Sequence, residues 1–499
     1  MHCNSETLKK IDFGSLDGAT DPNLRKYFYN DNYWQNIVEN NHFFVIGRKG
    51  TGKSAIYRWI EGESQDKGAL CVNLGFKEFP FQRLLSLTDD NFSLPNQYQS
   101  IWRYMILTEL AKLIAMDGNI TINDYSKELV SYITQVFGTT AVDMHKKVAE
   151  MAEKSGTNIS MPKFPINLTN ESTYTNKLET QPYDNINNIN RRLQDVIVSY
   201  LRCYQGTSLF LVQFDQLDDN YNSYTDKDKY FQSIISLFKV IYNLNQDFIR
   251  NELPAKIIAY IRSDIFYKID QYDAESARWE EYRTNLDWSI VDVDDYRRGK
   301  LRKLLNKRIS ASVPIDGDQW DCVFDREKLR LKVGNDFRYD LFKYVVNRSF
   351  HRPRDIVQFC KKMQLAAIDH EPIDFNTIRK AEREYSLWLL QEITNELSNE
   401  IANIKPLFDF LRRLGPNPMS ITDFKNQYKN TDMQHKDSDM LAILYRTGIV
   451  LNVQILQQGN RMNKRYFSSI RNERSSLNPD LMIELHKGLW KGLYVQTFG

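Results

Sequence analysis

The sequence predicts an α/β protein built on a parallel three-layer sheet, and three observations lead to this fold class. Short apolar runs that can form buried strands alternate with longer stretches of helical periodicity. The first apolar run ends in a glycine-rich loop, and a later one ends abruptly in acidic residues. Beyond the last predicted strand the pattern is almost wholly helical, which indicates a helical region followed by a separate C-terminal unit.

The first strand is expected at Phe43–Ile46, after an N-terminal approach segment formed by residues 1–40. That segment carries turn dipeptides followed by an aromatic helical pattern. Four consecutive apolar residues suit a strand that is buried on both faces of a parallel sheet. After the loop, the segment SAIYRWIEG predicts a helix that ends at Gly62.

Between that strand and that helix lies the pattern G-x-x-x-x-G-K-[ST]. In such a P-loop, backbone N–H groups surround phosphates, the lysine reaches the β- and γ-phosphate oxygens, and the hydroxyl binds Mg²⁺. The following helix presents its positive end to the anion. A chance match in a chain of this length has a probability of about one or two per cent. The expected nucleotide-binding residues are Gly47, Arg48, Lys49, Gly50, Thr51, Gly52, Lys53, Ser54 and Ala55.

A second buried strand is expected in GALCVNLGF, and a helical insertion follows at residues 85–205. Apolar residues recur at helical spacing from Ile101 to about Ala152. Residues 156–186 are rich in Asn, Thr, Ser and Pro without periodicity, so we expect a flexible linker there. The P-loop NTPase core is therefore expected to comprise residues 41–84 and 206–292.

The segment SLFLVQFDQLDD supplies candidate groups for hydrolysis. Asp215 follows six mostly apolar residues, so it should emerge at the carboxyl end of a central strand, beside the loop. There it can hold Mg²⁺ together with Ser54. Asp218 or Asp219 could orient or deprotonate the attacking water, and a strand end capped by solvated acids is the alternative.

Two further segments carry arginines that could contact a phosphate. In the predicted strand AKIIAYIRSDIF, Arg262 could point at a γ-phosphate or form a structural salt bridge. The segment NRSFHRPRDIVQF places Pro353 at the start of a helix, flanked by Arg352 and Arg354. A helix dipole disfavours cations at this end, and either a phosphate or a carboxylate such as Asp355 would offset that penalty.

These segments together resemble the AAA+-related P-loop ATPases, and more narrowly the STAND-type and origin-recognition-like bacterial ATPases. The similarity rests on GRKGTGKSAI, FDQLDD, YIRSDIF and HRPRDIVQF, and covers residues from about 11 to 370 apart from the insertion. The opening FGSLDGATDPNL and the loop itself resemble a group of bacterial ATPases often found with mobile elements and anti-phage systems.

The resemblance implies a role for each candidate residue. Asp215 corresponds to the Walker B metal ligand, and Asp218 or Asp219 to the catalytic acid. Arg262 corresponds to sensor-1, and Arg354 or Arg352 to sensor-2. The expected catalytic residues are Lys53, Asp218, Asp219, Arg262 and Arg354, and the expected metal ligands are Ser54 and Asp215.

The C-terminal part predicts two units. Residues 293–396 resemble the helical lid of these ATPases, and residues 397–499 predict a winged-helix domain, with three helices before two strands around a basic Gly-Asn turn. The third helix, DSDMLAILYRTG, is acidic at its start, which favours a structural or protein-binding role over DNA reading. The basic residues of the wing are Arg461, Lys464, Arg465 and Arg471.

Composition restricts the partners. The 499 residues include 66 basic and 64 acidic side chains, and the net charge of +2 gives no overall attraction to nucleic acid or membranes. Five cysteines and seven histidines are scattered without metal-ligand spacing, and the N-terminus has no apolar targeting segment. We therefore expect a cytoplasmic protein without membrane contact.

The sequence thus predicts a Mg²⁺-dependent ATPase, for which three functions remain open. In the first, ATP binding and hydrolysis control self-association or a separate effector protein, in the anti-phage context that the resemblance implies. In the second, a loader-type or initiator-type ATPase grips DNA through the winged helix. In the third, the protein binds nucleotide tightly with little turnover.

Overall fold

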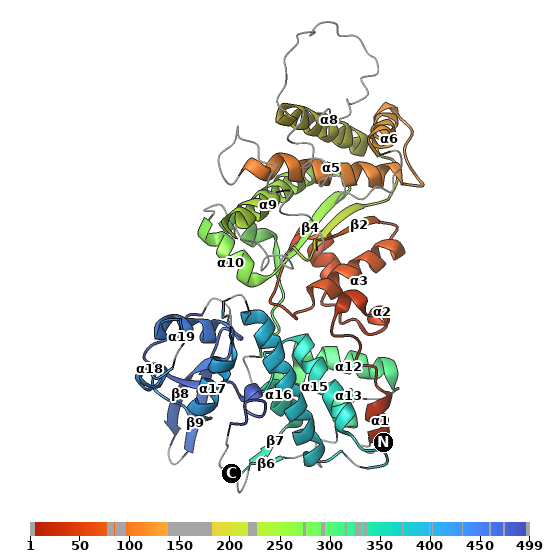
Figure 1. The fold of residues 1–499 in the computed structure, drawn as a ribbon. Helices are drawn as coiled ribbons and strands as arrows, with labels where there is room; N and C mark the ends of the chain where they lie inside the picture. The colour runs from red at the N-terminus through yellow and green to blue at the C-terminus, as the bar shows by residue number, and fades with distance from the viewer. Residues whose placement is uncertain are drawn as a thin grey trace. The chain divides into compact units, whose positions relative to one another are not determined.

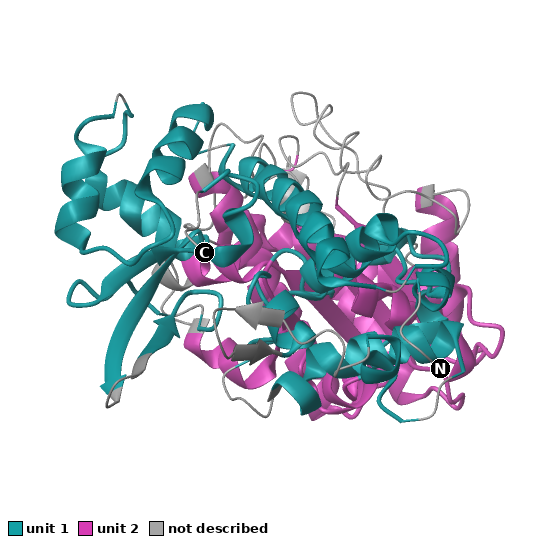
Figure 2. Ribbon diagram, turned by 90° about the horizontal axis from the view of Figure 1, so that it is seen from below, with its two compact units in different colours: residues 1–30, 49–52, 287–499 teal, residues 31–48, 53–286 magenta. Residues whose placement is uncertain are grey.

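The computed structural model describes residues 5–76, 84, 96–137, 182–217, 227–272, 276–290, 295–314, 317–324, 331–333, 337–371, 373–398, 400–401, 403–431, 433–458, 461–472 and 475–495. Contacts within the chain divide it into two compact units (Figure 2). Unit 1 comprises Met1–Asn30, Lys49–Gly52 and Asp287–Gly499, and unit 2 comprises Asp31–Arg48 and Lys53–Leu286. The short segment 49–52, in the middle of the glycine-rich loop, is thus grouped with the C-terminal half of the chain.

Within the described residues, the centre of unit 2 is a five-stranded parallel sheet with the order β2-β3-β4-β1-β5. The predicted parallel α/β core is confirmed, and β1 to β4 fall in the apolar runs that predicted them. The edge strand β5 was not predicted, because its residues Arg-Thr-Asn carry no apolar signal. The bounds are β1 Phe44–Ile46, β2 Leu70–Gly75, β3 Phe210–Asp215, β4 Ala255–Ile261 and β5 Arg283–Asn285.

The two central strands β3 and β4 are buried along their whole lengths, which explains their near-continuous apolar sequences. Gln213 interrupts the apolar run of β3 and is fully buried. Its amide donates to Asn73 Oδ1 on β2 at 2.9 Å and accepts from the Tyr260 hydroxyl on β4 at 2.6 Å. A buried polar side chain is stable here because the neighbouring strands satisfy it.

Helices flank this sheet and form the insertion of unit 2 (Figure 1). Helix α5 is buried on nearly all sides because α6, α8, α9 and strand β3 surround it. The bounds are η2 Trp34–Glu39, α3 Lys53–Asp66, η3 Asn96–Tyr98, α5 Gln99–Ala115, α6 Asp124–Phe137, α8 Pro182–Arg202, α9 Lys227–Arg250, α10 Ser263–Tyr272 and η5 Ser276–Tyr282.

The predicted linker 156–186 is wrong at its C-terminal end, because α8 already begins at Pro182. Proline is tolerated in the first helical turn, where its missing N–H would have no helical partner. Ile186, Ile189 and Leu193 then form the start of a buried helical stripe. Residues 156–181 of the predicted linker lie outside the described residues.

Unit 1 is mainly helical, with a small three-stranded antiparallel sheet ordered β10-β8-β9 and a hairpin β6-β7. Three helices precede β8 and β9 as predicted, whereas β10 was not predicted. The bounds are α1 Ser5–Lys10, η1 Gly18–Thr20, α2 Leu24–Tyr27, α11 Asp295–Arg298, α12 Lys300–Ser312, α13 Gln319–Val323, β6 Leu331–Val333, β7 Phe337–Tyr339, α14 Leu341–Val346, α15 Pro353–Ala366, α16 Phe375–Leu397, α17 Lys405–Leu414, α18 Ile421–Tyr428, α19 Asp437–Arg446, β8 Val450–Gln458, β9 Arg461–Phe467, β10 Met482–Leu485 and η6 Lys487–Leu489.

The N-terminal segment belongs to unit 1 up to residue 30, and α12 and α15 hold it there. Arg308 on α12 donates to the Phe13 carbonyl and lies 4.6 Å from the centre of the Tyr27 ring. Lys361 on α15 donates to the Gly14 carbonyl at 2.6 Å. The first thirty residues are therefore part of the helical unit, and only residues 31–40 of the predicted approach segment belong to the unit that contains the sheet. In the part of the chain that the structure describes, no helix combines the length and apolarity that a membrane span requires.

Candidate functional site

The loop between β1 and α3 begins at the carboxyl edge of the parallel sheet. The Gly47 N–H donates to the Ile261 carbonyl at 3.2 Å, and the Gly47 carbonyl accepts from the Ser263 N–H at 3.3 Å. The start of the loop is thus hydrogen-bonded to the end of β4. Ligands of open α/β sheets bind at this edge, because the loops there are free to carry functional groups.

Asp215 ends strand β3 at the same edge. Strand β4 lies between β1 and β3, so two strand spacings, about 10 Å, separate the backbones of β1 and β3. Ala259 pairs with both Phe44 and Phe214, so Asp215 is one residue past the level of Phe44. Its side chain is nearly buried. After burial itself, the Asp215 charge is the largest cause that raises the pKa of Tyr57 and Tyr260 above the ordinary value.

Lys53 begins helix α3, and its ammonium group turns back onto the loop. Its Nζ donates to the carbonyls of Gly47 at 2.8 Å and Arg48 at 3.2 Å. The carboxylate of Asp264 is also within its electrostatic range. Burial opposes ionisation of that carboxyl, but Arg262, and after it Lys53, hold the pKa of Asp264 below its usual value. Ser54 lies half-buried in the same first turn of α3.

Arg262 forms a two-pronged ion pair with Asp264. Its Nε and Nη2 donate to the two carboxylate oxygens at 2.9 and 2.7 Å. This is the salt bridge that the sequence left open as an alternative to a phosphate contact. This geometry uses the Nε and Nη2 groups of Arg262, which are two of the three nitrogens of its guanidinium.

Within unit 1, three consecutive carbonyls of the loop accept hydrogen bonds. The Lys49 carbonyl accepts from Arg352 Nη1 at 3.2 Å, and the Gly50 carbonyl from the Arg354 backbone N–H at 3.3 Å. The Thr51 carbonyl accepts from the Trp288 indole at 3.0 Å. In a trans peptide the C=O and the following N–H point in opposite directions. The N–H groups of residues 50, 51 and 52 therefore point away from these three donors.

Glycine is required in this part of the loop for two different reasons. Gly50 has a φ of +85°, and a Cβ there would lie 3.1 Å from the Cβ of Arg354. Gly52 has a φ of +99°, but a Cβ there would meet no atom within 4 Å. Positive φ favours glycine at both positions. A side chain at Gly50 would in addition require Arg354 to move by a few tenths of an ångström, whereas the space beside Gly52 is open.

Arg352, which donates to the Lys49 carbonyl of the loop, is almost completely buried. Two carboxylates of the same unit hold its guanidinium in place. Its Nε lies 3.1 Å from both oxygens of Asp355, and its Nη1 lies 3.0 Å from Glu396 Oε1. Burial alone would lower the pKa of Arg352, but Asp355 and Glu396 raise it above its ordinary value. The carboxylate alternative that the sequence offered for this helix start is thus present. Asp355 also accepts from the Phe350 N–H at 2.8 Å.

Arg354 is less constrained than Arg352. Its Nη1 lies 3.3 Å from Glu392 Oε2, an oxygen that Lys49 Nζ also approaches at 3.6 Å. The Arg354 Nε has no hydrogen-bond partner among the described residues, although it is buried. A shared carboxylate and an unsatisfied Nε leave this guanidinium with donors for a further acceptor.

The structure brings together most of the expected site residues within their own units. Loop residues 49–52 meet Arg352 and Arg354, and Lys53 lies near the Arg262–Asp264 pair. Asp218 and Asp219 lie outside the described residues. Trp288, Glu392 and Glu396 were not predicted, because no local pattern links them to a loop more than two hundred residues earlier.

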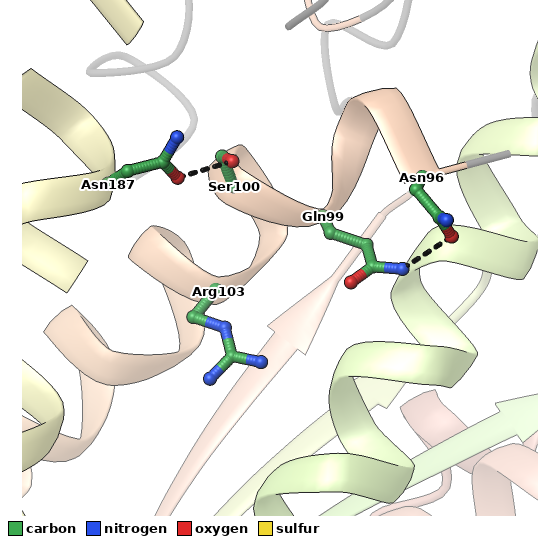
Figure 3. Close-up of a pocket in the computed structure, with 5 residues that line it drawn as sticks. All are labelled: Asn96, Gln99, Ser100, Arg103 and Asn187. Carbon is green, nitrogen blue, oxygen red and sulfur yellow. Dashed lines mark hydrogen bonds between the residues drawn. The ribbon is translucent and has the colours of Figure 1, made fainter. Parts of the chain in front are cut away.

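A separate polar cavity of about 250 Å³ lies in the insertion of unit 2 (Figure 3). It is lined by Asn96, Gln99, Ser100, Arg103 and Asn187. The close-up shows Ser100 bonded to Asn187 and Gln99 bonded to Asn96, at 2.6 and 2.7 Å. The side chains that line this cavity therefore largely satisfy one another.

Two comparisons relate the chain to known sequences. Residues 299–394, which span α12 to most of α16, match the FunZ-associated C-terminal helical domain. Over 487 residues, or 94% of its length, the chain is 21% identical to an Escherichia coli (strain K12) protein whose name is transposon gamma-delta 80.3 kDa protein. The chain spans 63% of the length of that relative. The matched range contains Arg352, Arg354 and Glu392, which contact loop residues 49 and 50, whereas Glu396 lies beyond it.

Proposed function

We propose that the chain is a Mg²⁺-dependent ATPase, that Gly47–Ser54 is its P-loop, and that its nucleotide state works as a switch. The observation that carries the proposal is the orientation of the loop peptides. Three carbonyls are turned toward Arg352, Arg354 and Trp288, so the N–H groups of residues 50–52 face the opposite side. Successive N–H groups on one side of a loop, before a helix N-terminus, suit a phosphate.

Each residue then has a defined task. The N–H groups of residues 50–52 bind phosphate oxygens, and Lys53 exchanges its bonds to the Gly47 and Arg48 carbonyls for bonds to the β- and γ-phosphates. Ser54 and Asp215 hold Mg²⁺. Bound ATP supplies the phosphoryl group that is transferred to water. Asp218 or Asp219 orients that water.

The switch is proposed because the loop is bonded directly to the helical region. A change in the path of residues 49–51 alters the acceptors of Arg352, the Arg354 N–H and Trp288. Two of these donors lie at the start of α15, so the loop conformation acts on that helix. We propose that the outputs are self-association and control of a separate effector protein. The transposon name of the relative supports a role connected with mobile elements.

A DNA-reading function receives less support from the C-terminal region. If residues 397–499 form a winged helix, α19 takes the place of the recognition helix. Its first turn carries Asp437 and Asp439, and phosphates repel such charges. We therefore propose that this region serves structure or protein contacts.

The metal assignment provides the test of the proposed function. Asp215→Ala should weaken ATP binding in Mg²⁺ much more than in EDTA, because its role acts through the metal, and ATP turnover should be lost. The matched control is Asp195→Ala, which removes an exposed carboxylate from α8 of the same unit. Equal weakening in Mg²⁺ and EDTA would contradict the assignment of Asp215 as a metal ligand.

A further inference from the structure

A cavity of about 330 Å³ within unit 1 is lined by an unusual number of cations. It lies between α14 with its following turn and the β8–β10 sheet with the segment that follows it. We call it the basic pocket and define it by its five cationic lining residues, Lys343, Lys464, Arg465, Arg471 and Lys487. None of these residues belongs to the proposed P-loop or to its partners, and two of them, Lys343 and Lys487, lie outside the segment predicted as a basic wing.

The charges of the basic pocket are poorly balanced. Its lining contains no Asp or Glu among the residues that the structure describes. Lys464 pairs with the nearly buried Glu484 at 2.7 Å. No described carboxylate lies within ion-pair distance of the other four cations: Arg471 donates to the Tyr466 carbonyl, and Arg465 lies over the Phe467 ring. The basic pocket therefore contains at least three positive charges that no described carboxylate pairs with.

Burial, together with this excess of positive charge, lowers the pKa values of two side chains that line the pocket, Lys487 and His486. Burial, followed by the positive charges of Arg348, Lys464 and Lys343, lowers the pKa of Lys487, although Glu484 opposes the shift. Burial and the charges of Lys487, Arg348 and Arg471 lower the pKa of His486 to about 3. His486 is therefore neutral, and its Nδ1 accepts a hydrogen bond from the Gly488 N–H at 3.1 Å. A bound anion would relieve the mutual repulsion of these groups.

We propose that the basic pocket binds a small anion that carries at least two phosphate groups. Lysine and arginine bind phosphate through charge-assisted hydrogen bonds, and several cations are needed to match the charge of a diphosphate. The volume is well above that of one water molecule, about 30 Å³ in the liquid. Lys343 and Lys487 already lie over the rings of Tyr296 and Tyr466, at 5.3 and 5.2 Å, so the recognition acts through phosphates and not through stacking on these faces.

The pocket also adjoins the turn that positions Arg352. Asn347 and His351 line the pocket, and His351 adopts a left-handed φ of +53° directly before Arg352. Its Nδ1 accepts from the Ile290 N–H at 3.2 Å. An anion in the basic pocket would therefore contact the same turn that holds the Lys49 carbonyl of the loop.

Pyrophosphate titrations of the full-length chain test this proposal. A P-loop would also bind pyrophosphate, so the titrations are made in a Lys53→Ala background, at constant ionic strength. The test variant adds Lys343→Gln and Lys487→Gln, and the matched control adds Lys429→Gln, which removes an exposed lysine of the same unit. This design separates the two proposals, because Lys53→Ala weakens binding at the proposed P-loop and all three chains share whatever binding remains there, so a difference between the test variant and the control comes from the basic pocket.

We expect pyrophosphate to bind the Lys53→Ala background and its Lys429→Gln control equally, and the double variant at least about tenfold more weakly, which corresponds to 1.4 kcal/mol. Arg465→Gln, at an exposed position where substitution spares the fold, should weaken binding about two- to fivefold. Binding to the double variant within twofold of the background would overturn the proposal. A DNA surface is the other outcome that would overturn the proposal. In that case the Lys53→Ala background would fail to bind pyrophosphate but would bind a 20-base-pair duplex in a salt-dependent way, and the double variant would lose this duplex binding.

Discussion

The glycine-rich loop and the basic pocket both have cationic side chains beside them, but these cations are paired with carboxylates beside the loop and are mostly unpaired in the pocket. Beside the loop, Arg262 pairs with Asp264, Arg352 with Asp355 and Glu396, and Arg354 with Glu392. In the basic pocket, Lys464 alone of the five cations pairs with a described carboxylate. The paired guanidinium of Arg352 donates a hydrogen bond to the Lys49 carbonyl of the loop. Unpaired cations in a cavity create a positive potential that an anion can neutralise.

The difference separates two kinds of anion site. The proposed P-loop depends on the direction of its peptide N–H groups, and the ion pairs around it maintain that direction. The basic pocket depends on side-chain charge. Substitutions that break an ion pair should therefore damage the loop through its structure, whereas neutralised cations should affect the pocket through affinity alone.

The largest expected effect is at Asp355, which is fully buried beneath Arg352. Asp355→Ala leaves a buried guanidinium without one of its two carboxylate partners and the Phe350 N–H without its acceptor. We expect a loss of about 3–5 kcal/mol in the free energy of unfolding, measured by denaturant titration. Glu392→Gln is the matched control. It breaks the partly exposed pairs of Arg354 and Lys49, so it should cost less than about 1 kcal/mol. Similar losses of unfolding free energy in Asp355→Ala and Glu392→Gln would contradict the distinction between the buried pair of Arg352 and the partly exposed pairs of Glu392.

The next effect concerns Arg354, whose donors are incompletely satisfied. If its guanidinium contacts the γ-phosphate, Arg354→Ala removes a charge-assisted hydrogen bond worth roughly 1.5–3 kcal/mol. ATP should then bind about ten- to a hundredfold more weakly, and ADP should change much less. Calorimetric titrations with both nucleotides provide the measurement. Equal losses for ATP and ADP would show that the Arg354 side chain only stabilises the start of α15 through its ion pair with Glu392.

A smaller effect tests the charge surplus of the basic pocket through His486. The unfolded chain binds a proton on this side chain below a pH of about 6.5, whereas the native chain binds it only near pH 3. Unfolding therefore takes up a proton between these values, and stability falls as the pH decreases. From pH 6.5 to pH 5 this contribution is about 2 kcal/mol.

The comparison variant is His486→Asn, in which the amide oxygen can still accept from the Gly488 N–H. Its unfolding free energy should decrease with falling pH by about 2 kcal/mol less than that of the native sequence over the same interval. The measured quantity is the pH dependence, so a constant loss of stability in the variant does not matter. Parallel pH profiles for the two chains would show that His486 titrates normally.

Local patterns allowed much of the sheet to be predicted. Four strands were marked by buried apolar runs, and the loop by its glycine and lysine spacing. The parallel arrangement then placed Asp215 at the correct edge without knowledge of any contact. Strand β5 was missed because Arg-Thr-Asn has no apolar signal, and strand β10 was missed because a mostly apolar run of only four residues, Met-Ile-Glu-Leu, does not by itself mark a strand.

The support around the loop could not be predicted in the same way. Asp355 lies three residues from Arg352, within the reach of local reasoning, but Glu396 and Trp288 come from distant parts of the chain. The basic pocket likewise joins Lys343 to Lys464 and Lys487 through folding alone. No composition shift marks residue 30, where the N-terminal segment changes from one unit to the other.

The most direct measurement is the affinity of the full-length chain for ATP and Mg²⁺, determined by calorimetry for the native sequence and for Lys53→Ala. The proposed P-loop requires that the native chain binds and that Lys53→Ala loses binding while it keeps its circular-dichroism spectrum and melting temperature, since the loop carbonyls are held by Arg352, Arg354 and Trp288. Lys67→Ala, at an exposed position beyond the end of α3, is the matched control and should bind like the native chain. Unchanged ATP affinity in folded Lys53→Ala would contradict the assignment of Gly47–Ser54 as the nucleotide site.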